Sequence, residues 1–104
     1  MVNRHRGEVA AELDGRTFTL CLTLGALAEL ETAFEVDDLP ALIARFSDTS
    51  LSARDMLKII GAGLRGGGHP LTDAEITEMQ AEGGALGYAR IVSQLLQATF
   101  GQGQ

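Results

Sequence analysis

The chain has 104 residues, of which 45% are apolar, and its formal net charge is -6. This length suits one domain with one hydrophobic core, because a second independent core would need more chain to bury enough surface. The 14 acidic and 8 basic side chains argue against a nucleic acid partner, since contacts with phosphate backbones generally rest on clustered Lys and Arg. The short basic segment 4–6 does not change this expectation.

Cysteine usage and hydropathy predict a cytoplasmic protein. Cys21 is the only cysteine, so the chain has no internal disulfide, and a single thiol is typical of a reducing compartment. No apolar run approaches the roughly 18 residues that cross a bilayer, and the first residues lack the apolar block of a signal peptide. The membrane is therefore not an expected partner.

Residues 7–23 are predicted to form a β-hairpin. Apolar residues alternate along both halves of this segment, and Asp14-Gly15 stands between the halves. Asp-Gly is a strong signal for a two-residue type I′ turn, which needs positive φ at both central positions. The residues expected on the buried face are Val9, Ala11, Leu13, Phe18, Leu20 and Leu22.

After the hairpin the apolar spacing becomes helical. In the first helix Leu27, Leu30 and Phe34 form a stripe, which Leu24 and Ala28 are expected to widen. Helix-capping residues and glycines then divide the chain further. The helices are predicted at about 24–35, 38–46, 52–65, 73–81 and 85–99, with residues 1–6 and 101–104 disordered. The fold class is therefore α+β, an N-terminal hairpin packed against four to five helices.

The glycine-rich stretch after residue 60 contains a misleading motif. Gly61, Gly63 and Gly66 have the G-x-G-x-x-G spacing of dinucleotide sites. In those sites the glycines lead into a helix N-terminus, whose free amides bind phosphate. Here they lie at a predicted helix C-terminus, where free carbonyls repel anions. The run 66–68 therefore predicts a helix stop and a hinge, and no nucleotide cofactor.

No pattern of catalytic or metal-binding residues is visible. His69 and His5 are the only histidines, and neither stands at ligand spacing from Cys21. Ser52 and Ser93 have no histidine nearby in sequence to activate them. We therefore expect no enzyme activity, no cofactor and no metal, and we expect His69 to be a solvent-exposed loop residue.

Several short strings carry a resemblance to a phage-derived family. The chain resembles the small tail proteins encoded in bacterial gene transfer agent clusters, which are labelled tail tube or tail assembly chaperone proteins. The resemblance extends from residue 3 to about residue 100. The matching strings are NRHRGEV at 3–9, LTLGALAELE at 22–31, VDDL at 36–39, LSARD at 51–55 and GAGLRGGGH at 61–69.

The resemblance implies two alternative roles in tail morphogenesis. One is a tail assembly chaperone in the bacterial cytoplasm that binds the tape measure protein during tail assembly. The other is a structural, tail tube-associated component of the particle that oligomerises through the hairpin edge, because an isolated hairpin leaves unpaired backbone groups. Related tubes rely on extended β-sheets, so a mostly helical chain with one hairpin favours the chaperone.

A partner-binding groove is expected between the hairpin and the last helix, whose apolar arc is wide. Arg65 has two open interpretations, since it either neutralises the last carbonyls of its helix or anchors a partner. The predicted partner-binding residues are Arg65, Gly66, Gly67, Gly68, Tyr88, Val92 and Leu96.

Overall fold

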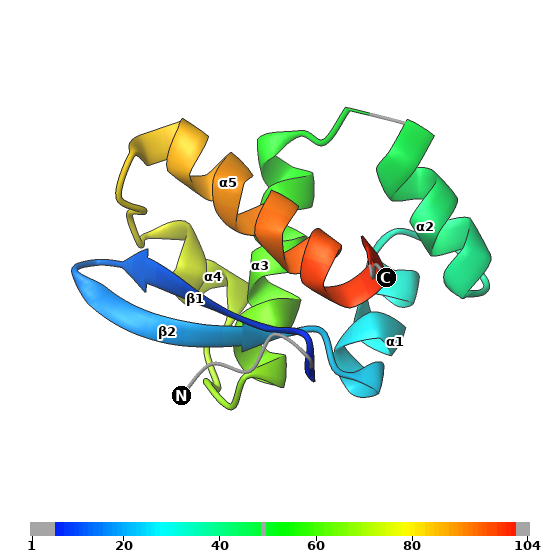
Figure 1. Ribbon diagram of the computed structural model, residues 1–104, viewed down its shortest axis with the longest axis horizontal. Helices are drawn as coiled ribbons and strands as arrows, with labels where there is room; N and C mark the ends of the chain where they lie inside the picture. Colours follow the sequence, from blue (N-terminus) through cyan, green and yellow to red (C-terminus); the bar gives the residue numbers. More distant parts are fainter. Residues whose placement is uncertain (1–5, 49, 102–104) are drawn as a thin grey trace.

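The computed structural model describes residues 6–48 and 50–101, and it confirms an α+β fold with an N-terminal hairpin followed by five helices (Figure 1). Most of the termini predicted to be disordered lie outside the described residues. Gly101, which was included in that prediction, ends a short π-helical segment. The elements are β1 (Glu8–Leu13), β2 (Arg16–Cys21), α1 (Leu24–Ala33), α2 (Leu39–Asp48), α3 (Ala53–Gly66), α4 (Asp73–Thr77), α5 (Gly84–Leu96) and η2 (Gln97–Gly101).

The hairpin forms as its sequence predicts. Asp14 and Gly15 have φ of 54° and 75°, the positive values that a type I′ turn requires. The strands pair antiparallel in a register that runs from Leu13 opposite Arg16 to Glu8 opposite Cys21. All six residues predicted for the buried face are buried.

Side-chain caps set the start of four helices. At α2 the Asp38 carboxylate accepts a hydrogen bond from the Ala41 N–H at 3.0 Å. The Thr23 hydroxyl accepts a hydrogen bond from the backbone N–H of Ala26, at 3.1 Å, at the start of α1. Ser52 and Asp55 form a complete capping box at the start of α3. Thr72 forms the corresponding box with Glu75 at the start of α4, as predicted.

The fourth helix is shorter than predicted. The sequence predicts a helix over 73–81, but α4 ends at Thr77. The following segment bonds to the hairpin turn instead: the Asp14 N–H donates to the Gln80 carbonyl at 2.8 Å, and the Asp14 carboxylate accepts from the Gln80 N–H at 2.9 Å. Ala81 then forms a single bridge with the end of β1. Tertiary hydrogen bonds therefore overrode the local helical preference.

The third helix is the centre of the fold. In Figure 1, α3 runs behind the hairpin, with α1 and α2 on one side and α4 on the other. Every residue from Ile59 to Leu64 is buried. The small residues within this run allow close approach, because a Cβ on Gly63 would lie 2.7 Å from a methyl carbon of Leu95 in α5.

The glycine run ends α3 in a Schellman motif. The N–H of His69 donates to the Leu64 carbonyl at 2.9 Å, and the N–H of Gly68 donates to the Arg65 carbonyl at 3.1 Å. Gly68 has a φ of 97°, the left-handed conformation that this motif places on glycine. The predicted helix stop is confirmed.

The same glycines bring the end of α3 onto the outer edge of β2. A Cβ on Gly66 would overlap the Cys21 carbonyl oxygen, and a Cβ on Gly67 would overlap the Thr19 carbonyl oxygen. The Thr19 N–H, on the same edge, donates to His69 Nε2 at 3.3 Å. The absence of side chains at 66 and 67 thus lets a helix end cover a strand edge.

His69 is not the exposed loop residue that was expected. It is half-buried, and its ring meets the Phe18 ring edge-on, with centroids 4.9 Å apart. The prediction was wrong because the partners of His69 are about fifty residues away in sequence. His69 therefore covers the edge of β2 at Thr19.

Replacing Gly67 with Ala is expected to lower the free energy of unfolding by about 1 to 3 kcal/mol, the range for overpacking a filled site. Gly25→Ala is the matched control, because that helical position is exposed and a Cβ there makes only ordinary contact. The control should be neutral or stabilising by up to about 1 kcal/mol. Chemical denaturation checks both, and equal effects would contradict the close contact at Gly67.

The contribution of Asp55 to the free energy of unfolding is expected to depend on pH. The pKa of Asp55 is lowered mainly because its carboxylate accepts a hydrogen bond from the Ser52 backbone N–H. Arg45, whose guanidinium nitrogen lies 3.2 Å from a carboxylate oxygen of Asp55, lowers this pKa further. A carboxylate with a lowered pKa stabilises the fold above its unfolded pKa, about 3.9 for Asp, and this contribution is lost as the pH falls through the folded pKa. Asp55→Asn should therefore cost about 1 kcal/mol at pH 7. In urea unfolding at several pH values, this difference should shrink below about pH 4; a constant difference would contradict the assignment.

Candidate functional site

An apolar pocket of about 370 Å³ opens between the first half of α3, the α4 region and the start of α5. Two nearly inaccessible side chains, Ile60 and Ile76, form its deepest part. Two methionines contribute to the walls, and thioether side chains adapt their shape readily to an incoming group. The principal apolar lining residues are Met56, Leu57, Ile60, Ile76, Met79 and Tyr88.

The pocket is not where the sequence predicted a groove. A groove was expected between the hairpin and the last helix, but that space is filled by core side chains. Val92 and Leu95 of α5 are buried there with Leu20 of β2. The apolar residues of α5 therefore face in two directions. Val92 and Leu95 pack in the core, whereas Tyr88 lines the pocket.

Tyr88 lines the pocket, and a hydrogen bond holds its ring in place. Its hydroxyl donates to the Met79 carbonyl, which joins α5 to the segment after α4. Burial raises the pKa of Tyr88, and the nearby negative charge of Asp14 raises it further. Tyr88 is therefore neutral near pH 7, and its hydroxyl is used as a hydrogen-bond donor within the pocket wall.

Arg54 is the charged residue that lines the pocket. Its side chain is exposed, and no ion pair joins it to another described residue. A partner that places an apolar side chain in the pocket and an acidic one beside it would complement both features.

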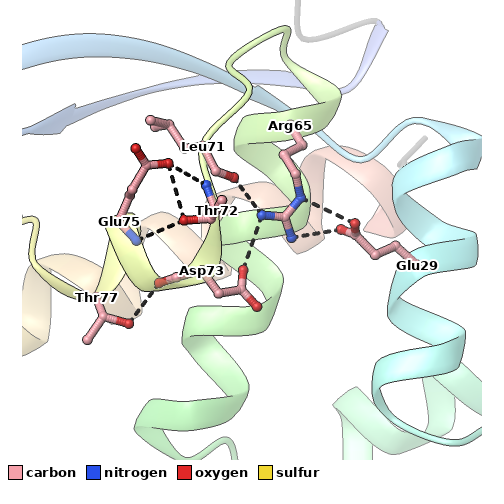
Figure 2. Close-up of polar contacts among 7 residues, drawn as sticks. All are labelled: Glu29, Arg65, Leu71, Thr72, Asp73, Glu75 and Thr77. Carbon is pink, nitrogen blue, oxygen red and sulfur yellow. Dashed lines mark hydrogen bonds and ion pairs between the residues drawn. The ribbon is translucent and has the colours of Figure 1, made fainter.

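Arg65 is an internal clamp, an arrangement that neither sequence interpretation included (Figure 2). Its guanidinium binds both carboxylate oxygens of Glu29 on α1, at 2.9 and 3.2 Å. It also pairs with Asp73 of α4 at 3.2 Å and donates to the Leu71 carbonyl at 2.8 Å. These carboxylates raise the pKa of Arg65, with the Glu29 hydrogen bonds as the largest cause. One side chain thus joins α1, α3 and the start of α4.

The structure separates the predicted partner-binding residues. Arg65 and the glycine run lie at the C-terminal end of α3, whereas Tyr88 lies against the N-terminal half of that helix. Val92 is a core residue and Leu96 is half-buried. Of these residues, Tyr88 lines the pocket. A role of any of them, Tyr88 included, in binding a partner stays a prediction.

The outer edge of β1 is open in its middle. Because the turn has two residues, hydrogen-bonded and non-hydrogen-bonded pairs alternate from Leu13–Arg16, and Ala10 falls opposite Thr19 in a non-hydrogen-bonded pair. The N–H of Thr19 points away from β1 toward His69, so the backbone groups of Ala10 point outward on the other edge. Ala10 is exposed, and within residues 6–48 and 50–101 no backbone hydrogen bond reaches this edge position.

Two leucine side chains are exposed, which the sequence did not predict. Leu24 is 77% exposed and Leu86 is 75% exposed. The expectation that Leu24 and Ala28 widen the buried stripe of α1 was wrong, since both are exposed and the stripe consists of Ala26, Leu27 and Leu30. Leu24 is the first residue of α1 and lies beyond the end of the buried stripe.

Within the part of the chain that the structure describes, no group of three His, Cys, Asp or Glu side chains is placed to hold a metal ion. Among the same residues, no helix has the length and apolar character of a membrane span.

Comparison with known families matches residues 6–102 to the family described as phage tail tube protein, GTA-gp10. The chain belongs to this family. The match spans the hairpin and every helix described above, so family membership applies to the whole fold. It confirms the resemblance to gene transfer agent tail proteins and a tail-related role. No curated protein and no solved structure matches the chain significantly.

Replacing Arg65 with Lys should destabilise this tail protein by about 1 kcal/mol, because an ammonium group cannot reproduce the two-oxygen contact with Glu29. Arg54→Lys is the control: Arg54 is an exposed arginine without an ion pair among the described residues, and its change should stay within about 0.5 kcal/mol. A double-mutant cycle with Glu29→Gln should then show coupling between Arg65 and Glu29. Additive effects would contradict the clamp.

Proposed function

We propose that this protein is a structural component of a gene transfer agent tail, present in the particle, that oligomerises through the outer edge of β1. Membership of a tail tube family supports a structural role over the chaperone role that helical content favoured. A tail component associates with other tail proteins, so its surface must form the same contacts in each copy.

The observation that carries this proposal is the difference between the two edges of the hairpin. The edge of β2 is covered at Thr19 and Cys21 by the end of α3. The edge of β1 presents the backbone groups of Ala10 to solvent. An exposed strand edge is a template for pairing with another strand.

The partner strand is β1 of a second copy. Because the end of α3 covers the edge of β2 at Thr19 and Cys21, the second copy contributes β1 to this contact. Antiparallel pairing of two β1 strands about a two-fold axis produces a four-stranded sheet, which is more stable than an isolated hairpin. Because the open part of the β1 edge is short, the contact between two copies is small. A small contact suits an assembly that is held together by several weak contacts.

The test replaces Ala10 with Pro in cells that make particles. Proline removes the outward N–H and is tolerated at edge positions whose N–H faces solvent, so the monomer should stay folded. Mass spectrometry of purified particles should find the wild-type protein in amounts comparable to other tail proteins. The Ala10→Pro protein should be reduced about tenfold or more, equivalent to about 1.4 kcal/mol of lost contact energy.

Ala10→Ser is the matched control, because it changes the side chain slightly and keeps the N–H; its incorporation should equal that of the wild type. Absence of the wild-type protein from mature particles would contradict the structural role. Binding to tape measure fragments together with that absence would favour the tail assembly chaperone in the cytoplasm.

A further inference from the structure

Pairing of β1 with β1 closes at two copies, because a two-fold contact uses the same patch on both partners. A tail component that assembles further needs a second contact on another surface. Resting on the proposed structural role, we propose that the apolar pocket between α3, α4 and α5 receives Leu24 of a second copy in a head-to-tail contact.

The pocket has the properties of a socket for one apolar side chain. Its volume of about 370 Å³ is larger than a leucine side chain, and Ile60 and Ile76 close its deep end. Met56 and Met79 on the walls can adjust to the shape of the side chain that enters. Burial of one leucine side chain is a modest hydrophobic gain, which suits one weak contact among several.

Leu24 has the properties of the matching knob. It is the most exposed of the large apolar side chains in the described residues, at 77%. Gly25 and Ala28 lie beside it and are exposed and small, so the leucine projects beyond its neighbours on α1. The Thr23 cap fixes the first turn of α1 and therefore the position of the knob.

The knob and the socket lie on opposite sides of the molecule. Figure 1 shows α1 on one side of α3, and α4 with the start of α5 on the other. A contact between two different surfaces on opposite sides is heterologous, and it produces a ring or an open chain of copies. This is the geometry that a repeating tail structure requires.

Charge supports the same orientation. Segment 29–38, on the side of α1, contains five carboxylates and no Lys or Arg. Glu31 and Glu35 of this segment form no ion pair with the described residues, and neither does Arg54 at the socket. Docking of Leu24 brings Glu31, about two helical turns further along α1, toward the socket that Arg54 lines in the next copy.

The test mixes two variants that each keep one half of the contact. Both carry Ala10→Pro, so that association through β1 is removed. Leu24→Glu destroys the knob and keeps the socket, whereas Ala85→Trp fills the socket from its exposed rim and keeps the knob. Circular dichroism confirms that each variant is folded, and analytical ultracentrifugation with native mass spectrometry measures its mass.

The Ala10→Pro parent should form oligomers at high concentration, and each of the two variants alone should be monomeric. Their mixture should form a one-to-one heterodimer that grows no further. Leu86→Glu is the control for placing a charge on an exposed leucine, because Leu86 is 75% exposed and is not among the residues that line the socket; this variant should assemble like the parent.

A parent that stays monomeric at millimolar concentration would overturn the head-to-tail contact, as would a mixture that forms no heterodimer. Loss of assembly in Leu86→Glu with normal assembly in Leu24→Glu would also overturn it, in favour of a contact through Leu86. None of these results depends on the protein content of particles, so failure of this contact and failure of the structural role are distinguished.

Discussion

The contact between the C-terminal end of α3 and the carbonyl edge of β2 determines much of this structure. Gly66 and Gly67 permit it, because a side chain at either position would overlap a backbone oxygen of β2. His69 completes it by accepting the Thr19 N–H. The contact stabilises a two-stranded hairpin that would be marginal alone. It also holds the central helix, whose other faces pack against α1, α4 and α5.

The same contact makes the two hairpin edges different, and this difference connects the fold to function. The edge of β2 is covered at Thr19 and Cys21, whereas the backbone groups of Ala10 on the edge of β1 are open to pairing. Family membership gives the protein a tail-related role. Our proposals place strand pairing at β1 and head-to-tail docking at the pocket. Each contact is weak by itself, as expected for a subunit that assembles with others of its kind.

Sequence reasoning succeeded where the determining interactions are local. The Asp14-Gly15 turn and the capping boxes at Ser52 and Thr72 depend on residues within a few positions of one another. It failed where partners are distant. Arg65 meets Glu29 across 36 residues, and the segment after α4 bonds to Asp14 across 66, which shortened the predicted helix. The pocket was also misplaced, because the apolar pattern of α5 does not reveal which side the hairpin covers.

Hydrogen exchange measured by NMR on dilute protein tests most directly whether α3 covers β2 and leaves β1 open. The amide of Thr19 should exchange slowly, because it is bonded to His69 Nε2 beneath the glycine run. The amide of Ala10, directly opposite on the other strand, should exchange rapidly. Equal exchange at the two amides, or a protected Ala10 in the monomer, would contradict the proposed difference between the edges.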